Sequence, residues 1–351
     1  MLVEPAEFPP SSEARAKGRN AFKKYHRTVT EFAYGSLTRP SQSLPMPASI
    51  SVGLAARESQ PDLSDFAATL DEMAGLGLDH VEIPAFTYDL VLAGRPMTAR
   101  VAEFETICRG RQHGFTVHGP LSINFMGPPA HLPRVLEATK AFIEICARIG
   151  APHLVVHAGM MQPAESHDFE NAAGRQRDYL HQAGEFAAKH RVILCVENLF
   201  DFGPYAATPS IARLARELAA IGHDHVRATF DFSHGLIHAT QRGYDFLDEA
   251  KALAPFAQHL HLHDCFGVPD LPWVYAHAEA NAYGFGDLHL PQGWGAVPWA
   301  ELAEGCCFPA EVIAIHELNF RFWRDRHEAL GAARRFVSAL SHSTHLSHSA
   351  I

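Results

Sequence analysis

The chain has 351 residues, 47% of them hydrophobic and 19% charged, which is enough for one α/β barrel or for two smaller domains. Its net charge of −10 disfavours a general nucleic-acid or membrane-surface binder, and no apolar run resembles a membrane span or a signal peptide. We therefore expect a cytoplasmic protein, whose six cysteines are reduced thiols because no CxxC pair occurs. The 24 histidines are unusually many, and imidazole is the commonest protein metal ligand.

The two ends of the chain differ from its middle. Residues 1–47 are rich in proline and serine, carry basic side chains and lack hydrophobic periodicity, so we expect a flexible N-terminal extension. The alternative is a basic patch for a phosphorylated partner or an oligomer contact. Residues 341–351 repeat serine and histidine and predict an unstructured tail, in which metal binding by His342, His345 and His348 is a remote alternative.

Between these ends, in residues 48–340, short apolar runs alternate with amphipathic segments. The apolar runs are typical of parallel strands buried on both faces, and we predict strands at Ala48–Leu54, His80–Pro84, Phe115–His118, His153–His157, Val192–Glu197, Val226–Asp231, His259–His263 and Val312–Glu317. Helices are predicted at Ser64–Leu76, Pro133–Ile149, Arg175–His190, Pro209–Ala220, Tyr244–Leu253, Trp299–Glu304 and Trp323–Leu340. With no glycine motif for dinucleotides or phosphates, this alternation predicts a single-domain (β/α)8 TIM barrel rather than a doubly wound sheet.

Six consecutive predicted strands end in histidine or carboxylate residues, namely His118, His157, Glu197, Asp231 with His234, His261 with Asp264, and Glu317. TIM barrels assemble their chemistry at the C-terminal ends of the strands. One histidine there is usually structural, but six such ends in order indicate a common site. Converging carboxylates repel one another unless a cation neutralises them, and mixed histidine and carboxylate ligands suit Zn, Mn, Fe or Co.

The seventh predicted strand carries His259, His261 and His263 on one face, which we expect to line the barrel. At most one or two of the three are expected to reach a metal. The stretch Cys265–Val297 that follows is long and rich in proline, glycine and aromatic residues. Long loops are often functional, so we expect it to close over a substrate. The aromatic rings expected to exclude water, with structural packing as the alternative, are Trp273, Tyr275 and Trp294.

The order Glu197, Asp231-x-x-His234, His261-x-x-Asp264, Glu317 resembles the xylose isomerase-like TIM-barrel superfamily over roughly residues 48–340. That superfamily contains sugar isomerases and epimerases, inosose-type dehydratases and the endonuclease IV family. The resemblance implies a divalent metal held by Glu197, Asp231, His261 and Glu317.

Further motifs are similar to those of the endonuclease IV branch: His118 in VHGPLSIN, His157 in VVHAG, and Asp287-x-His289 followed by GWG. The resemblance implies up to three zinc ions, with Glu197 bridging two, and with further ligands or substrate contacts at His118, His157, His234, Asp287 and His289. Gly119 and the Leu-Pro-Gln after His289 depart from that branch, which weakens DNA repair more than metal binding. One to three divalent ions per chain (Zn, Mn, Co or Fe) are therefore expected.

The favoured function is a metal-dependent isomerase or epimerase, or related carbanion chemistry, on a small sugar-like substrate with or without a phosphate. Glu197 and Glu317 would act as the catalytic acid and base. The residues expected to bind the substrate are His234, Asp264, Trp273 and Trp294. Apart from this small molecule, the interpretation includes neither nucleic acid nor a membrane as a partner, and it leaves a homo-oligomer open.

The alternative function is a multinuclear-zinc phosphoester hydrolase of the endonuclease IV-like type, because clustered metals activate water and stabilise an in-line displacement. A small phosphorylated substrate is preferred over DNA, since duplex binding needs several phosphate contacts. Arg57 and Arg95 could meet a phosphate or could simply be solvated. A non-catalytic metal-binding or scaffold protein is a third, weaker interpretation, because so many ionisable groups in a barrel mouth are costly without a function.

Overall fold

The computed structural model describes residues 49–203, 207–269, 274 and 276–348, without the side chains of residues 49, 163, 277 and 341–348. The predicted N-terminal extension at 1–47, the aromatic residues Trp273 and Tyr275 and the histidine side chains of the tail therefore lie outside the described parts. Among the described residues, no helix is both long enough and apolar enough to cross a membrane.

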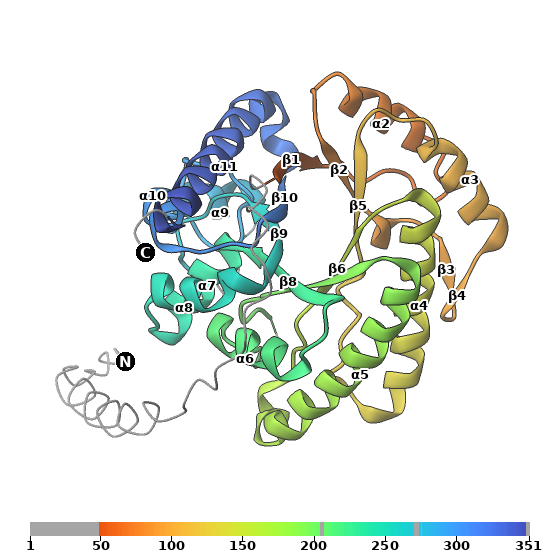
Figure 1. Ribbon diagram of the computed structural model, residues 1–351, viewed down its shortest axis with the longest axis horizontal. Coiled ribbons are helices and arrows are strands. Elements are labelled where there is room, and N and C mark those ends of the chain that lie inside the picture. Colours follow the sequence, from red (N-terminus) through yellow and green to blue (C-terminus); the bar gives the residue numbers. More distant parts are fainter. Residues whose placement is uncertain (1–48, 204–206, 270–273, 275, 349–351) are drawn as a thin grey trace, which may run out of the picture. The chain divides into compact units, whose positions relative to one another are not determined.

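Eight parallel strands close into a barrel with helices outside it (Figure 1). The hydrogen-bonded order around the barrel is β1, β10, β9, β8, β7, β6, β5, β2 and back to β1. The strands are β1 (Ser49–Ala55), β2 (His80–Pro84), β5 (Gly114–His118), β6 (His153–His157), β7 (Ile193–Glu197), β8 (Val226–Asp231), β9 (Ala257–Leu262) and β10 (Glu311–His316). The predicted TIM barrel is confirmed, and each predicted strand has its counterpart.

The helices are α2 (Phe66–Ala74), α3 (Thr98–Cys108), α4 (Leu132–Ile149), α5 (Phe169–His190), α6 (Ile211–Ile221), α7 (Phe232–Arg242), α8 (Phe246–Leu253), α9 (His277–Tyr283), α10 (Trp299–Gly305) and α11 (Arg326–His348). Of these, α3, α7 and α9 were not predicted. Helix α7 begins at the residue after β8, so its first residues were taken for the end of the strand. Helix α11 runs past Leu340 into the predicted tail, as far as His348.

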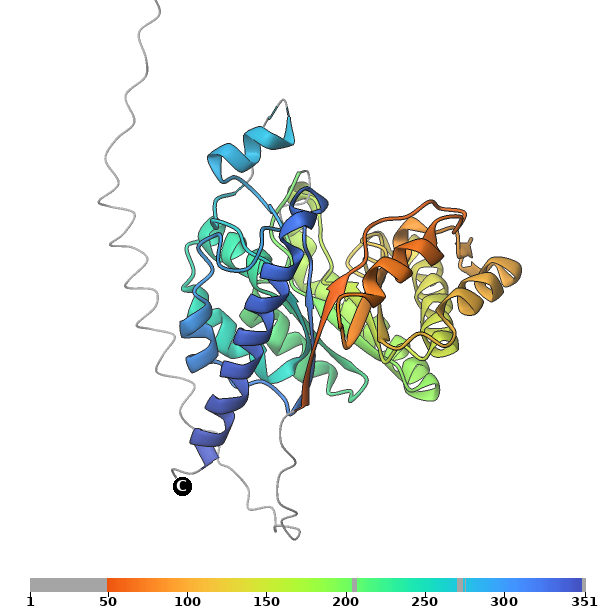
Figure 2. The ribbon, with the colours of Figure 1, turned by 90° about the horizontal axis from the view of Figure 1, so that it is seen from above.

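Shorter elements complete the connections. An antiparallel hairpin is formed by β3 (Val91–Leu92) and β4 (Arg95–Pro96). The 3-10 helices are η1 (Ala85–Thr87), η2 (Pro129–His131), η3 (Pro163–Asp168), η4 (Ala254–Phe256) and η5 (Phe320–Asp325). Figure 2 shows α9 projecting from the barrel at the end toward which β1 runs, which is the end where the chemistry of this fold is assembled.

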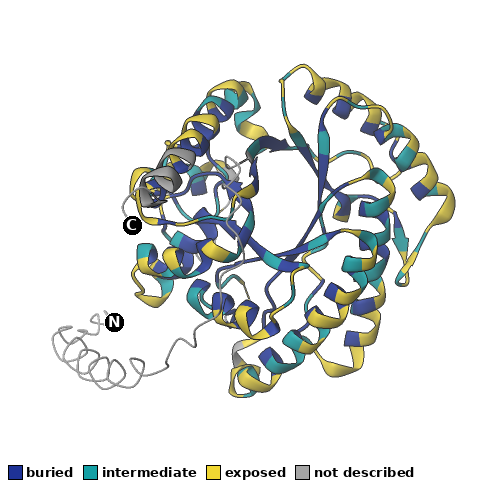
Figure 3. Ribbon diagram, in the orientation of Figure 1, coloured by how far each residue is buried: buried dark blue, intermediate teal, exposed yellow. Residues whose placement is uncertain are grey.

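Burial follows the layers of the barrel. Figure 3 shows the strands as mostly buried, whereas the helices are buried along their inner faces and exposed outside. In α4 the inner face includes Leu132, Leu136 and Ile143, whose spacings of four and seven residues place them on one side of the helix. The helix ends at Gly150, whose φ of 72° suits a residue without a side chain. The resulting rigid barrel fixes the relative positions of the strand ends.

Candidate metal centre and active site

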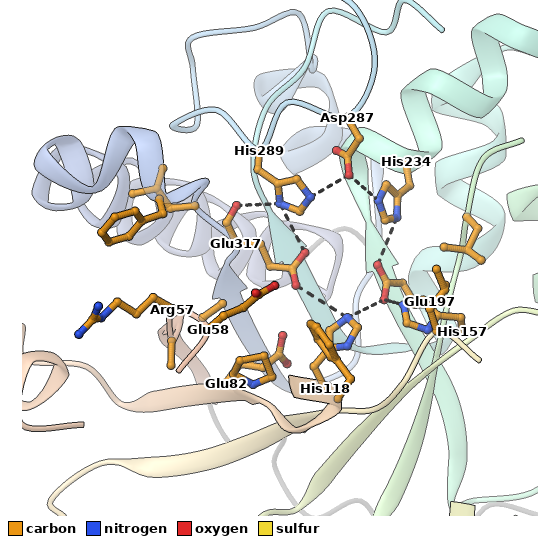
Figure 4. A pocket seen from close by; sticks show the side chains of 18 of the residues that line it. Arg57, Glu58, Glu82, His118, His157, Glu197, His234, Asp287, His289 and Glu317 are labelled. Carbon is orange, nitrogen blue, oxygen red and sulfur yellow. Dashed lines mark hydrogen bonds and ion pairs between the residues drawn. The ribbon is translucent and has the colours of Figure 1, made fainter. Parts of the chain in front are cut away.

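The strand ends bring all nine predicted metal-site residues into one cluster, which Figure 4 shows for seven of them. Among the described residues, potential ligand atoms that lie within 4.8 Å of one another form five groups, three of which together contain the nine predicted residues. The central group is Glu197, Asp231, His261 and Glu317; the inner-strand group is His118, His157 and Glu197; the loop group is His234, His263, Asp287 and His289. A fourth group joins His118, His261 and Glu317, and a fifth joins Glu82, His259 and His261. The convergence inferred from the sequence is therefore present in the fold.

The central group comes from the ends of four neighbouring strands: Glu197 from β7, Asp231 from β8, His261 from β9 and Glu317 from the residue after β10. Asp231 and His261 are paired in the register of β8 and β9, so their side chains are neighbours at the barrel mouth. His261 is fully buried, and its Nδ1 lies 3.2 Å from Glu197 Oε1, 3.3 Å from Glu317 Oε2 and 3.8 Å from Asp231 Oδ2. Three carboxylates thus surround one imidazole nitrogen, an arrangement that a divalent cation would stabilise.

The inner-strand group meets the central group at Glu197. His157 and Glu197 are register partners on β6 and β7, and His157 Nε2 lies 3.3 Å from Glu197 Oε2. His118 Nε2, from the end of β5, lies 3.4 Å from the same oxygen. The two oxygens of Glu197 therefore face different groups, with Oε1 toward His261 and Oε2 toward His118 and His157. This is the geometry that a carboxylate needs to bridge two ions.

The loop group begins at the start of α7. Asp231 is the N-cap of this helix, and its Oδ1 accepts a hydrogen bond from the backbone N–H of His234 at 2.8 Å. This cap holds His234, three positions after Asp231, beside the carboxylate of Asp231. Asp287 Oδ2, from the long loop after β9, lies 3.1 Å from His234 Nε2 and 2.7 Å from His289 Nε2.

The backbone of His289 has a φ of 47°, a left-handed conformation that is uncommon for residues other than glycine. Such conformations persist where the surroundings enforce them, and they are frequent at functional sites. Here the conformation accompanies a ring whose Nε2 contacts Asp287 and whose Nδ1 contacts the backbone of Glu317. The strain is consistent with a side chain that is held in place for a function.

Three histidines of the cluster are oriented in the same way. Each places Nδ1 within 3.0–3.1 Å of a backbone carbonyl oxygen; the pairs are His118 with Gly119, His234 with Asn198, and His289 with Glu317. If Nδ1–H donates to the carbonyl, Nε2 is left free and faces the carboxylates. Metal-binding histidines are commonly fixed by such contacts. The donor set therefore fits divalent metal ions.

The charges in the cluster depend on one another. Burial opposes ionisation of Glu197, but His261, His118 and His157 outweigh it and hold the pKa of Glu197 well below its usual range. Burial likewise opposes the charged form of His289, but Asp287 raises the pKa of this histidine to about 9. Glu197 Oε2 and Asp287 Oδ1 are buried and have no hydrogen-bond partner in the described part of the chain. These oxygens are available to a cation.

Glu82 on β2 belongs to the site and was missed in the sequence analysis. It is buried, with Oε1 3.0 Å from His261 Nε2 and Oε2 3.2 Å from His259 Nε2. Thr116 Oγ1 donates a further hydrogen bond to Glu82 Oε2 at 3.0 Å. The available signal was a charged residue between Val81 and Ile83, inside an otherwise apolar strand.

All three histidines of β9 and its end belong to groups of potential ligands, whereas at most two were expected to reach a metal. His261 belongs to the central group, and His263 Nε2 lies 2.7 Å from Asp231 Oδ2 and joins the loop group. His259 contacts Glu82 and forms with Glu82 and His261 a further group of potential ligands.

A cavity of about 750 Å³ opens over the cluster. The described residues that line it are Ala55, Ala56, Arg57, Glu58, Glu82, Pro84, Phe86, His118, Leu121, His157, Glu197, Leu199, Phe200, Phe202, His234, Asp287, His289, Glu317, Leu318, Phe320 and Trp323. Among them Arg57 is the one arginine or lysine, and Figure 4 shows it beside Glu58 at one side of the site. This volume lies within the range of about 300–1,000 Å³ that is typical of small-molecule sites.

Other predicted substrate contacts lie elsewhere. Asp264 is fully buried, and its carboxylate accepts hydrogen bonds from the backbone N–H of Gly293 at 2.8 Å and from Trp299 Nε1 at 2.9 Å. It thus anchors the long loop instead of facing the cavity. Trp294 donates from Nε1 to Glu328 Oε1 at 3.0 Å and does not line the cavity, and neither does the exposed Arg95.

The family described as xylose isomerase-like TIM barrel matches residues 70–304, whereas no curated protein matches the chain. Similar solved structures include a D-tagatose 3-epimerase-like protein, at a TM-score of 0.61 and 17% identity over 84% of this chain and 99% of that one. A 3-keto-D-glucoside 4-epimerase from E. coli has a TM-score of 0.57 and 15% identity over 82% and 100%. The IOLI protein with a bound zinc atom has 0.56 and 16% over 84% and 99%.

Proposed function

This chain belongs to the xylose isomerase-like TIM-barrel family, and on that basis we propose that it is a divalent-metal-dependent isomerase or epimerase of a small sugar-like molecule. The observation that carries the proposal is the central group, in which Glu197, Asp231, His261 and Glu317 converge, with Glu197 and Glu317 lining the cavity. Several solved structures of similar fold are described as sugar epimerases, and one holds zinc, which agrees with the proposal.

Two carboxylates are placed for proton transfer. Glu197 and Glu317 both line the cavity, from β7 and from the residue after β10, and Figure 4 shows them on either side of the His118 ring. In the proposal, one removes a proton from the reacting carbon and the other returns a proton to the opposite face. The low pKa of Glu197 keeps this carboxylate ionised and able to accept a proton. The bound ion would polarise adjacent substrate oxygens and so acidify the neighbouring C–H bond.

The histidines around the cavity supply the remaining contacts. His234 Nδ1 lies 3.2 Å from Glu197 Oε1, and His118 Nε2 lies 3.4 Å from Glu197 Oε2. In the proposal they orient the substrate hydroxyl groups beside the reacting carbon, so that the same carbon always faces the two glutamates. The substrate contacts expected from Asp264 and Trp294 are not part of the proposal, because neither lines the cavity.

Phosphoester hydrolysis is a second candidate, and it is favoured by the donors beyond the central group. His118 and His157 face Glu197 Oε2, and the loop group supplies Asp287 and His289, none of which simple proton transfer requires. Several adjacent ions could activate water and stabilise the leaving oxygen. The substrate would then be a small phosphorylated molecule, for which Arg57 is the nearby cation among the described lining residues.

Solvent-isotope incorporation separates the two candidates. The purified, metal-loaded protein is incubated in deuterated water with a panel of ketoses, aldoses and inositols, and in parallel with sugar phosphates. Proton transfer places deuterium on carbon in the substrate or product, whereas hydrolysis releases phosphate without carbon exchange. Elemental analysis is the companion measurement: about one manganese, cobalt or iron per chain supports the isomerase, and about three zinc ions support the hydrolase. No chelator-sensitive turnover of either panel would contradict both.

A further inference from the structure

Six apolar side chains line the cavity around the metal-ligand cluster, and we name them the apolar vestibule: Phe86, Leu121, Phe200, Leu318, Phe320 and Trp323. We propose that the vestibule binds an apolar part of the substrate, an aryl or alkyl group attached to the polar part that reacts at the glutamates. The inference rests on the proposed function, because that function places the reacting polar part of the substrate at Glu197 and Glu317. It adds that the natural substrate is a conjugate such as an alkyl or aryl glycoside, and not a free sugar.

The exposure of these side chains is the first observation. Phe86 is 46% exposed, Leu121 43% and Phe320 59%, although all three are large hydrophobic residues. Single exposed apolar residues are ordinary, but several that line one cavity mark a binding surface. The six residues follow the ends of β2, β5, β7 and β10, so the vestibule is built at the barrel end that carries the metal-ligand cluster.

The vestibule is continuous with the cluster. The ring of Phe86 packs edge-on against His118, with centroids 5.3 Å apart, and the ring of Phe200 lies 5.2 Å from that of His234. A substrate whose reacting carbon lies between Glu197 and Glu317 therefore extends directly into apolar surroundings. Trp323 is held in place by a hydrogen bond from Nε1 to Glu72 Oε1 at 2.6 Å, so part of the wall is fixed before any ligand binds.

The size of the cavity and the polarity of its lining also favour a substrate with an apolar group. The cavity of about 750 Å³ suits a drug-sized ligand better than a single sugar ring. Outside the cluster, the charged groups among its described lining residues are Arg57, Glu58 and Glu82, and Glu82 is already paired with two histidines. A longer polyol would place hydroxyl groups against phenylalanine and leucine without hydrogen-bond partners, which is unfavourable. An apolar group would instead be stabilised by removal of these side chains from water.

Binding of a neutral apolar probe tests the vestibule independently of turnover. N-phenyl-1-naphthylamine fluorescence is titrated with the full-length, metal-loaded protein and with two matched variants. Leu121→Ser removes a vestibule side chain, whereas Leu92→Ser alters a leucine that is 67% exposed on β3 and does not line the cavity. We expect Leu121→Ser to weaken probe binding about three- to ten-fold and Leu92→Ser to leave it unchanged. No binding, or equal binding by both variants, would overturn the inference.

Displacement of the probe defines the chemistry of the bound group. Methyl, butyl and hexyl glucosides are expected to compete with affinity that rises about two- to four-fold per added methylene group. A disaccharide is expected to compete no better than the methyl glucoside; stronger competition by the disaccharide than by the hexyl glucoside would overturn the inference. Probe binding without turnover of any sugar would contradict only the proposed function. Turnover of free sugars by a protein that does not bind the probe would contradict only the vestibule.

Discussion

Glu82 and His261 are in contact across the inside of the barrel, with Glu82 Oε1 3.0 Å from His261 Nε2. Their strands, β2 and β9, are separated around the barrel by β1 and β10. The contact occupies one nitrogen of His261 and leaves the other, Nδ1, facing Glu197 and Glu317. Glu82 therefore determines that Nδ1, and not Nε2, of His261 faces the central group. Carboxylates that contact the second nitrogen of a metal-binding histidine commonly have this role.

Replacement of Glu82 by glutamine is expected to weaken metal binding about 10- to 100-fold. One oxygen of Glu82 contacts His261, and the other contacts His259 and Thr116. A glutamine side chain has only one oxygen, so its NH2 group would replace an acceptor at one of these two positions. Metal content after dialysis against a graded chelator measures the change. Glu58→Gln is the matched control, since Glu58 is an exposed glutamate on the same cavity. Equal metal retention by both variants would remove Glu82 from this role.

Substitution of either glutamate proposed for proton transfer should abolish turnover. We expect Glu197→Gln and Glu317→Gln each to reduce kcat at least about 100-fold, the usual contribution of a positioned acid or base. Circular dichroism should show an intact fold in both, because the barrel is stabilised mainly by its buried apolar core. Full activity in either variant would count against both the isomerase and the hydrolase.

Removal of the His289 ring tests whether the loop group holds an ion. If it does, His289→Ala should lose about one metal per chain and most activity; if the central group alone binds, metal content should stay the same and the loss should be mild. His289→Asn is the control for the backbone, because asparagine tolerates the left-handed φ of 47° better than alanine does. A defect shared by both variants belongs to the ring, and a defect confined to alanine belongs to the backbone.

The strands were predictable because parallel strands buried on both faces appear as short apolar runs, as in β6, where all five residues are buried. The metal-ligand cluster was predictable for a topological reason. Once the strands are known to be parallel and to form a closed barrel, their C-terminal ends must meet at one mouth. His118, Glu197 and Glu317 could therefore be grouped although about two hundred residues separate the first from the last.

The features that could not be predicted from the sequence depend on the directions in which individual side chains and loops point. Glu82 precedes the end of its strand by two residues, so a search of strand ends passed over it. Asp264 follows a strand as a substrate contact would, but the loop folds back and occupies its oxygens with Gly293 and Trp299. Helix α7 was missed because Asp231 is both the last residue of β8 and the helix N-cap, with no linker between them.

The stability of the metal-free protein should decrease between about pH 6.5 and pH 9. Asp287 raises the pKa of His289 to about 9, against burial, from an ordinary value of 6.5. Below pH 6.5 this histidine is protonated in both the folded and the unfolded chain, and its pairing with Asp287 contributes fully. Above that pH the unfolded chain releases the proton while the folded chain retains it, so the contribution falls and is lost as the pH passes 9.

A metal ion must displace these protons, so binding should release them and should strengthen as the pH rises. We therefore expect the increase in Tm on metal addition to grow from pH 6.5 to pH 9, as measured by thermal unfolding with and without a chelator. The pKa values of His234 and His261 also lie well above their ordinary range, because nearby carboxylates outweigh burial, and they should add to the effect. In the metal-free His289→Ala variant the fall in Tm should be shallower. A metal-free protein whose Tm stays constant or rises over this interval would show that the histidines of the cluster are not held protonated by its carboxylates.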